Sequence, residues 1–186
     1  MSFRYEIRLS GEGGQGLVLA GKVLTEAAAI YEDMNATQSQ SYGPEARGGA
    51  SRSEVIISDE DIDYPKAVNI DLLLALTQES LNRYWHDLKE GGILLADSDS
   101  VKEFPEGNFR VYKVPIIKMA REEVGKAVVA NIVALGIITE LMGTVTANSV
   151  ESAILTRVPK GTEELNLKAF RLGIATGRNL KESDKG

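Results

Sequence analysis

The chain opens with a strict alternation of charged and hydrophobic residues. Tyr5, Ile7 and Leu9 are hydrophobic, whereas the positions on either side of them from residue 4 to residue 8 are charged. A period of two predicts a half-buried β-strand over residues 4–9. After a glycine-rich segment, apolar and small residues recur at steps of three and four over residues 17–31, which predicts one face of an α-helix.

The same patterns predict the other elements of the chain. Further strands are expected at residues 35–42, 50–58, 70–76, 93–96 and 109–114, of which the first is unusually polar. Further helices are expected at residues 79–89, 127–142, 149–157 and 162–180. The helix at 79–89 is expected to end before Gly91-Gly92, because glycine commonly terminates a helix. Residues 181–186 are expected to form a solvated tail.

Strands that alternate with helices are typical of an α/β protein. We therefore predict a single three-layer α/β/α domain over residues 1–186, with a mixed, mostly parallel sheet and a helical C-terminal third. The sheet is expected to be mixed because the strands at 35–42 and 50–58 are joined by a short loop and can pair as a hairpin. Gly21 lies on the predicted inner face of the first helix and is expected to allow close packing against the sheet.

The composition excludes several classes of protein. With 186 residues, 43% of them hydrophobic, the chain is long enough for one globular domain with a sizeable core. Its net charge of −6 argues against broad nucleic-acid binding, which needs a basic surface. The chain has no cysteine and a single histidine, His86. We therefore expect no disulfide, no cysteine-ligated iron–sulfur cluster and no ordinary zinc site on it.

The chain also lacks the patterns of secreted and membrane proteins. Its first residues enter the predicted strand at once and include no apolar segment typical of a signal peptide. The longest apolar runs are too short or too interrupted to span a bilayer. We therefore expect a cytoplasmic protein with no membrane partner.

The segment Gly11-Glu12-Gly13-Gly14-Gln15-Gly16 lies between the first predicted strand and the first predicted helix. Such turns bring backbone N–H groups to a helix N-terminus, where they bind anions such as phosphate. The segment also fits the G-x-G-x-x-G pattern of dinucleotide-binding proteins. A nicotinamide-dinucleotide site is disfavoured, because Glu32 and Asp33 precede the second strand and no acidic residue ends it. A turn that serves only chain reversal and packing is the other alternative.

A second glycine-rich segment joins the two predicted hairpin strands. Arg47 precedes Gly48-Gly49 within this segment, and Arg52 follows the two glycines in the next predicted strand. An arginine fork binds carboxylate or phosphate through two parallel hydrogen bonds, so these side chains are candidates for an anion contact. The alternative, which the sequence slightly favours, is a surface ion pair with Glu45 or Glu54.

Two aspartates, Asp97 and Asp99, follow the predicted strand at 93–96, at the end of the strand where α/β proteins bind ligands. Their carboxylates are able to hold a metal or a ribose, but capping a turn is the more common role and the one expected here. His86 has no predicted nucleophile beside it, so no catalytic triad is predicted. We therefore predict no catalytic residue and no metal ligand on this chain.

The two glycine-rich segments together resemble a known family. Residues 11–16, taken with residues 38–49 and Ser51, are similar to the gamma subunit of 2-oxoacid:ferredoxin oxidoreductases. Residues 53–58 and Tyr64-Pro65 resemble the same family, as does the order of strands and helices through residue 96. The resemblance is closest to the 2-oxoglutarate type, with the pyruvate and branched-chain types as alternatives. It implies that residues 1–186 form a pyruvate/ketoisovalerate oxidoreductase gamma-type catalytic domain.

The resemblance implies a multi-subunit enzyme that oxidatively decarboxylates a 2-oxoacid to its acyl-coenzyme A and reduces ferredoxin. In this family thiamine diphosphate is held by the alpha and beta subunits, and iron–sulfur clusters by the beta subunit or a ferredoxin-like delta subunit. This chain is then expected to bind no cofactor alone, to be inactive when isolated and to complete the assembly. The positions that match the family motif, and that are candidates for the coenzyme A site, are Gly11, Gly13, Gly14, Gln15, Gly16, Arg47, Gly48 and Gly49. An interface role for the same loops is the alternative.

Other functions stay open at this point. The small subunit of indolepyruvate:ferredoxin oxidoreductase resembles the same domain, and the substrate profile of the complex separates the two. A stand-alone nucleotide-binding α/β protein predicts that the isolated chain binds NAD or a flavin. A purely structural interaction module predicts no ligand but tight association with larger subunits.

Overall fold

The computed structural model describes residues 2–42 and 49–186. The strands are β1 (Arg4–Glu12), β2 (Asn35–Tyr42), β3 (Ala50–Ser58), β4 (Ile70–Ala75), β5 (Leu88–Asp97) and β6 (Arg110–Val114). The helices are α1 (Leu17–Glu26), α2 (Gln78–Tyr84), α3 (Ile116–Met119), α4 (Ala130–Met142), α5 (Ala147–Arg157) and α6 (Glu163–Ser183). Within the described ranges, no helix is both long enough and apolar enough to cross a bilayer.

All of the strands belong to one six-stranded sheet in the order β2-β3-β1-β4-β5-β6. Strands β1, β4, β5 and β6 run parallel to one another. Strand β3 is antiparallel to both of its neighbours, β1 and β2. The predicted hairpin of β2 and β3 is therefore confirmed, and so is the predicted mixed sheet.

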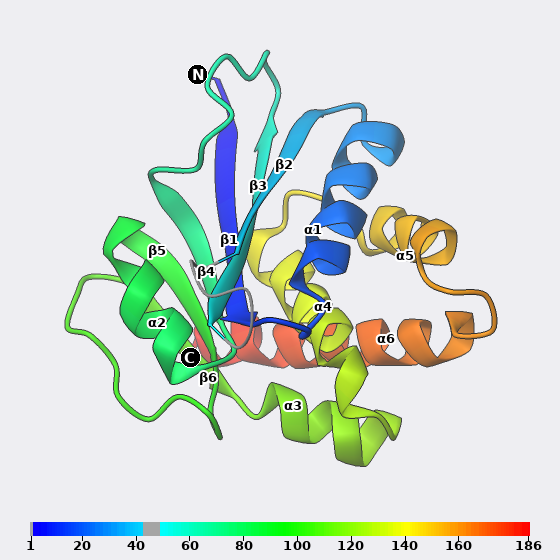
Figure 1. Ribbon diagram of the computed structural model, residues 1–186. Helices are drawn as coiled ribbons and strands as arrows, with labels where there is room; N and C mark the ends of the chain where they lie inside the picture. The colour runs from blue at the N-terminus through cyan, green and yellow to red at the C-terminus, as the bar shows by residue number, and fades with distance from the viewer. Residues whose placement is uncertain (1, 43–48) are drawn as a thin grey trace.

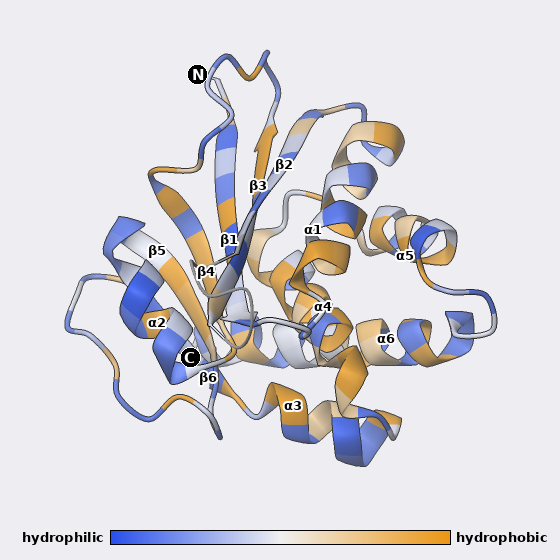
Figure 2. Cartoon of the chain, viewed as in Figure 1, coloured by the Kyte–Doolittle hydropathy of each residue, from blue (hydrophilic) through white to orange (hydrophobic). Residues whose placement is uncertain are grey.

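Helices cover both faces of this sheet, which confirms the predicted three-layer α/β/α fold (Figure 1). Helices α1, α4, α5 and α6 lie on one face and α2 lies on the other. Residues Ala130–Thr139 of α4 are all buried, and Figure 2 shows this helix as almost uniformly hydrophobic. The helical C-terminal third thus covers a face of the sheet.

Glycines allow close contact within the larger helical layer. A Cβ atom on Gly173 of α6 would overlap the backbone carbonyl oxygen of Val133 in α4, so only glycine fits this crossing. A Cβ atom on Gly21 of α1 would likewise overlap the hydroxyl of Ser53 in β3 and the side-chain amide of Gln38 in β2. The predicted close approach of the first helix to the sheet is confirmed.

The predicted role of Gly91-Gly92 is wrong. Helix α2 ends at Tyr84, a 3₁₀ turn covers Trp85–Asp87, and β5 then starts at Leu88, so both glycines lie inside a strand. The pairing of β4 with β5 shifts register here, and Gly91 has a φ of +75°. A bulge with a left-handed residue favours glycine for the same conformational reason as a helix end does, so the sequence alone does not separate the two.

Other boundaries differ from the prediction as well. Strand β1 continues to Glu12, because its last two residues pair with Ala50 and Ser51 of β3. The sequence analysis did not predict α3, nor the π-helical turn Ala120–Val124 that follows it. Helix α6 extends to Ser183 and so includes part of the predicted tail.

The charged side of β1 is buried rather than half-exposed. Glu6 is 4% exposed and Arg8 is 1% exposed. They lie on the α2 face of the sheet, beneath the segment 59–69 that joins β3 to β4 and is called the connector below. The alternation predicted the strand correctly, but it did not reveal that both of its faces are covered.

Candidate functional site

The glycine-rich turn lies at the carboxyl end of β1, immediately before α1. Gly11 and Glu12 still belong to the strand, and the turn itself is formed by Gly13, Gly14 and Gln15. Ligands of α/β proteins bind at the carboxyl ends of parallel strands, so the turn lies at the edge of the sheet where a ligand site is expected.

The side chain of Gln15 holds the turn closed. Its Oε1 accepts a hydrogen bond from the backbone N–H of Glu12 at 2.7 Å, and the backbone N–H of Gln15 donates to the Glu12 carbonyl oxygen at 3.3 Å. The Gln15 amide also occupies the space that a Cβ atom on Gly11 would need. The Gln15 amide therefore fixes the shape of the turn, and the absence of a side chain on Gly11 leaves room for it.

Asn131 at the start of α4 anchors the other end of the turn. Its Nδ2 donates a hydrogen bond to the Gly16 carbonyl oxygen at 3.0 Å, while its Oδ1 accepts one from the N–H of Ile132 at 2.9 Å. Gly16 has a φ of +74°, and a Cβ atom there would overlap the Asn131 amide. The sequence analysis missed Asn131, although it is the only polar side chain between residues 127 and 138.

The N-terminus of α1 has no side-chain cap, in contrast to two other helices. Thr77 caps α2 and Thr146 caps α5, each accepting a hydrogen bond from a backbone N–H in the first turn. In α1 the cap position is Gly16, and no acidic residue lies in the first turn. Free N–H groups and the positive end of the helix dipole are what an anion binds.

Backbone close to this helix end is open to a ligand. No described atom lies within 4 Å of the position that a Cβ would take on Gly13 or Gly14. A cavity of about 260 Å³ is lined by the turn, by the first residues of α1 and by Ser51 and Arg52 of β3. On the other side of the turn, a second cavity of about 310 Å³ is lined by Gly14, Gln15, Leu76, Ile117, Ala127, Val128 and Ala130.

The structure describes the second glycine-rich segment only in part. Arg47 and Gly48 lie outside the described residues. Gly49 is described and lies beside the turn, because the next residue, Ala50, pairs with Glu12 at the end of β1. The structure thus brings Gly49 close to the first glycine-rich segment.

Arg52 lines the first cavity and also makes the predicted ion pair. Its Nε lies 2.9 Å from Oε1 of Glu54, and its guanidinium group lies over the ring of Tyr84. The interpretation of Arg52 as one partner of a local ion pair is therefore confirmed. These contacts fix the side chain at the wall of the cavity.

The topology does not match a dinucleotide-binding unit. In such a unit the strand that follows the first helix lies beside the first strand, and an acidic residue at its end binds the ribose. Here the strand after α1 is β2, and β3 separates it from β1. The geometry therefore agrees with the expectation that a nicotinamide-dinucleotide site is disfavoured.

Asp97, the last residue of β5, has the structural role that was expected. Asp97 is fully buried, and its two carboxylate oxygens accept hydrogen bonds from the backbone N–H groups of Ser100 and Ile117, each at 3.0 Å. The first bond closes a turn and the second satisfies an N–H at the start of α3. Over residues 2–42 and 49–186, no group of His, Asp and Glu side chains is arranged to hold a metal ion.

The groups that line the cavity at the turn are suited to binding a ligand rather than to catalysis. Its lining offers backbone N–H groups, the hydroxyl of Ser51 and the guanidinium of Arg52, and it includes one acidic residue, the exposed Glu12. The described lining holds no histidine that would act as a base for Ser51. An anionic group is the ligand that this arrangement fits.

Comparisons with known proteins agree on one family. The sequence profile described as pyruvate ferredoxin/flavodoxin oxidoreductase matches residues 6–176. The chain is 52% identical to the 2-oxoglutarate synthase subunit KorC of Methanocaldococcus jannaschii over 97% of both chains. It is 30% identical to the pyruvate synthase subunit PorC of Methanothermobacter marburgensis, over 90% of this chain and 94% of that one.

A solved structure shows the same fold. The gamma subunit of a keto/oxoacid ferredoxin oxidoreductase from Geobacter sulfurreducens superposes with a TM-score of 0.88 at 53% sequence identity. The match covers 95% of this chain and 98% of that chain.

Proposed function

The chain belongs to the pyruvate ferredoxin/flavodoxin oxidoreductase family, and from that premise we propose that it is the gamma subunit of a 2-oxoglutarate:ferredoxin oxidoreductase. The resemblance inferred from the two glycine-rich segments is thereby confirmed at the level of the family. The proposed complex converts a 2-oxoacid and coenzyme A to carbon dioxide and the acyl-coenzyme A, and the electrons released reduce ferredoxin. We further propose that residues 1–186 form one gamma-type catalytic domain.

The choice of 2-oxoglutarate as the substrate rests on a difference in sequence identity. Identity to the 2-oxoglutarate synthase subunit is 52% over nearly the whole of both chains, whereas identity to the pyruvate synthase subunit is 30%. Such a difference over equivalent lengths favours 2-oxoglutarate over pyruvate.

The remaining machinery of the reaction belongs to other chains of the proposed complex. This chain has no cysteine to ligate an iron–sulfur cluster. We assign thiamine diphosphate to the alpha and beta subunits, and the clusters to the beta subunit or to a ferredoxin-like delta subunit. Ferredoxin is the electron acceptor of the whole complex, which we place in the cytoplasm.

For this chain we propose a contact with coenzyme A at the glycine-rich turn. The uncapped N-terminus of α1, the open backbone of Gly13 and Gly14, and Arg52 at the cavity wall fit the phosphate groups of such a ligand. Coenzyme A, when bound, supplies the thiol that takes up the acyl group. This chain binds and orients coenzyme A, because Gln15 and Asn131 hold the backbone donors in place.

The direct test of the complex is anaerobic affinity purification of the tagged chain from its native cell, followed by mass spectrometry and assays of the eluate. The proposal predicts that larger subunits with thiamine diphosphate and iron accompany the chain. It also predicts that the complex reduces ferredoxin with 2-oxoglutarate faster than with pyruvate, a branched-chain 2-oxoacid or indolepyruvate. A chain that elutes alone and binds NAD or a flavin would contradict it.

A second test addresses the coenzyme A contact. Arg47 lies outside the described residues, but it matches the family motif and belongs to the proposed site. The variant Arg47→Ala is expected to raise the coenzyme A KM of the reconstituted complex and to leave the KM for the 2-oxoacid unchanged. An unchanged coenzyme A KM in an intact complex would remove Arg47 from the site.

A further inference from the structure

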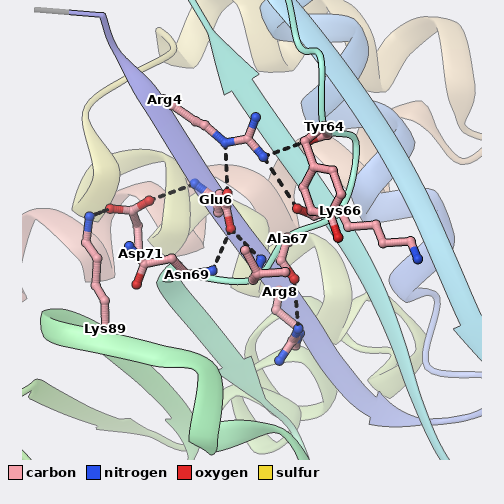
Figure 3. Close-up of polar contacts among 10 residues, drawn as sticks. Arg4, Glu6, Arg8, Tyr64, Lys66, Ala67, Asn69, Asp71 and Lys89 are labelled. Atoms are coloured by element: carbon pink, nitrogen blue, oxygen red, sulfur yellow. Dashed lines mark hydrogen bonds and ion pairs between the residues drawn. The ribbon is translucent and has the colours of Figure 1, made fainter.

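The connector between β3 and β4 contains no helix or strand, yet side chains of β1 fix its backbone (Figure 3). Arg4 donates hydrogen bonds from one guanidinium nitrogen to the carbonyl oxygens of Tyr64 at 2.9 Å and Lys66 at 3.4 Å. Arg8 donates to the carbonyl oxygen of Ala67 at 3.3 Å. Two arginines on the α2 face of one strand therefore hold neighbouring carbonyl groups of the connector.

Glu6 completes this set from between the two arginines. Its Oε2 accepts hydrogen bonds from the backbone N–H groups of Val68 at 2.8 Å and Asn69 at 2.9 Å. Its Oε1 pairs with Nε of Arg4 at 2.8 Å. The backbone from residue 64 to residue 69 is thus held at both its carbonyl and its N–H groups.

The groups that hold the connector are themselves fixed in the fold. Asp71 accepts a hydrogen bond from the backbone N–H of Glu6 at 2.8 Å and forms an ion pair with Lys89. At the start of the connector, Asp59 accepts a hydrogen bond from the N–H of Phe3 at 2.7 Å. Buried ion pairs add little net stability compared with apolar packing, so their main effect here is to fix one geometry of the connector.

This rigid connector presents apolar side chains to solvent. Tyr64 is 54% exposed and Val68 is 57% exposed, and both belong to the small set of large hydrophobic residues on the described surface. Tyrosine is among the residues that contribute most to protein interfaces. Because the backbone beneath these side chains is already ordered, this chain would lose little conformational entropy when a partner binds.

Exposed acidic residues precede the two apolar side chains in the connector. Asp59, Glu60, Asp61 and Asp63 precede Tyr64 and are exposed, and none of them forms an ion pair with another described residue. The only basic residue of the connector is Lys66. Two exposed apolar side chains that follow an acidic segment complement a partner surface that has an apolar pocket and basic side chains beside it.

We propose that the connector is a docking surface for a larger subunit of the same complex, which receives Tyr64 and Val68 in an apolar pocket bordered by lysine and arginine side chains. The identity of the partner rests on the proposed function. The connector packs along the first half of β1, whereas the glycine-rich turn follows the end of that strand.

The test is the affinity of the full-length chain for the remaining purified subunits, measured by surface plasmon resonance at several salt concentrations. Tyr64→Ala is expected to weaken binding at least about tenfold, because it removes the central apolar side chain. The double variant Asp61→Asn and Asp63→Asn is expected to slow association roughly threefold at low salt and to reduce the salt dependence of the association rate. Leu155→Ala is the matched control, since Leu155 is 49% exposed but lies on α5 at the other face.

Each result bears on one part of the account. Weaker binding by Tyr64→Ala, with wild-type binding by Leu155→Ala and an unchanged melting temperature, would establish the docking surface. Wild-type affinity of Tyr64→Ala would overturn the docking surface and leave the proposed function intact. Failure of the unaltered chain to bind the other subunits would overturn the proposed function, and with it the identity of the partner.

Discussion

The two faces of the central sheet differ in the side chains that they bury. On the face covered by α1, α4, α5 and α6, the sheet contributes apolar side chains, and the helices cross closely at glycines. On the face covered by α2 and the connector, the sheet contributes a smaller set of apolar side chains, such as Ile56, Leu73 and Leu94, and also Glu6, Arg8 and Glu54, which are all buried. One strand, β1, takes part in both, with Ile7 and Leu9 on the first face and charged residues on the second.

Both faces bury apolar side chains, but only the α2 face adds buried charged side chains from the sheet. Apolar contacts are non-directional, so the larger helical layer stabilises the domain mainly by burial, and it fixes the glycine-rich turn through a polar side chain, Asn131. Buried charges are directional, since each must keep its partners or lose much of its solvation energy. The charged face accordingly holds the connector and Arg52, the elements that we assign to a partner and to a ligand.

The largest expected effect is the removal of a charge from the second face. Arg8→Met leaves Glu54 without one of its two cationic neighbours and leaves the carbonyl oxygens of Tyr84 and Ala67 without a donor. We expect the free energy of unfolding in urea to fall by about 3–5 kcal/mol. Ile7→Val, a change on the apolar side of the same strand, is expected to cost about 1 kcal/mol.

A second variant separates charge from packing at this position. Adding Glu54→Leu to Arg8→Met removes the buried carboxylate as well, so part of the lost stability is expected to return. If Arg8→Met alone costs no more than Ile7→Val, the charged face does not have the role assigned to it.

The next effect is expected on the apolar face, from an added methyl group. Gly173→Ala forces the new Cβ against the backbone of α4, which has no flexible side chain there to move aside. We expect a loss of about 2 kcal/mol in the free energy of unfolding. Ala175→Gly is the control on the exposed side of α6, where the loss of a methyl group is expected to cost about 1 kcal/mol.

The smallest effect concerns a charge at the rim of the apolar face. Glu32 accepts hydrogen bonds from the Ser149 hydroxyl and the Thr146 N–H at the start of α5, and these hold its pKa below the ordinary value of 4.5. Because the pKa is lowered on folding, this stabilisation is fully present above pH 4.5 and is lost as the pH falls through the folded-state pKa.

The measurement is urea unfolding at pH 7 and at pH 3.5 for the unaltered chain and for Glu32→Gln. The variant is expected to lose less stability on acidification, by roughly 0.5 kcal/mol, because the carboxylate lies close to solvent. An identical loss in both proteins would show that the Glu32 carboxylate has no effect on the docking of α5.

Most of the fold follows from local patterns, whereas the coverage of the sheet does not. The alternation in β1 predicted a strand, but whether Glu6 and Arg8 face water depends on α2 and the connector, which are distant in sequence. Gly91-Gly92 shows a related limit, because a helix stop and a bulge require the same glycine conformation.

The candidate site, too, was predictable from the sequence only in part. The glycine-rich turn was evident from residues 11–16, because its chemistry is local. Its anchor was not, because Asn131 contacts Gly16 across 115 positions of the chain. A single polar residue within an apolar helix is the signal that points to such a contact, since a buried amide needs a partner.

The central claim is that coenzyme A contacts the backbone of the glycine-rich turn, and Gly13→Ala tests it most directly. No described atom lies near the added methyl group, so the variant is expected to fold and assemble like the unaltered chain. Gly186→Ala, also at an open glycine, is the control. In the reconstituted complex the account predicts that Gly13→Ala raises the coenzyme A KM at least about tenfold and leaves the KM for the 2-oxoacid unchanged. An unchanged coenzyme A KM in a fully assembled complex would contradict it.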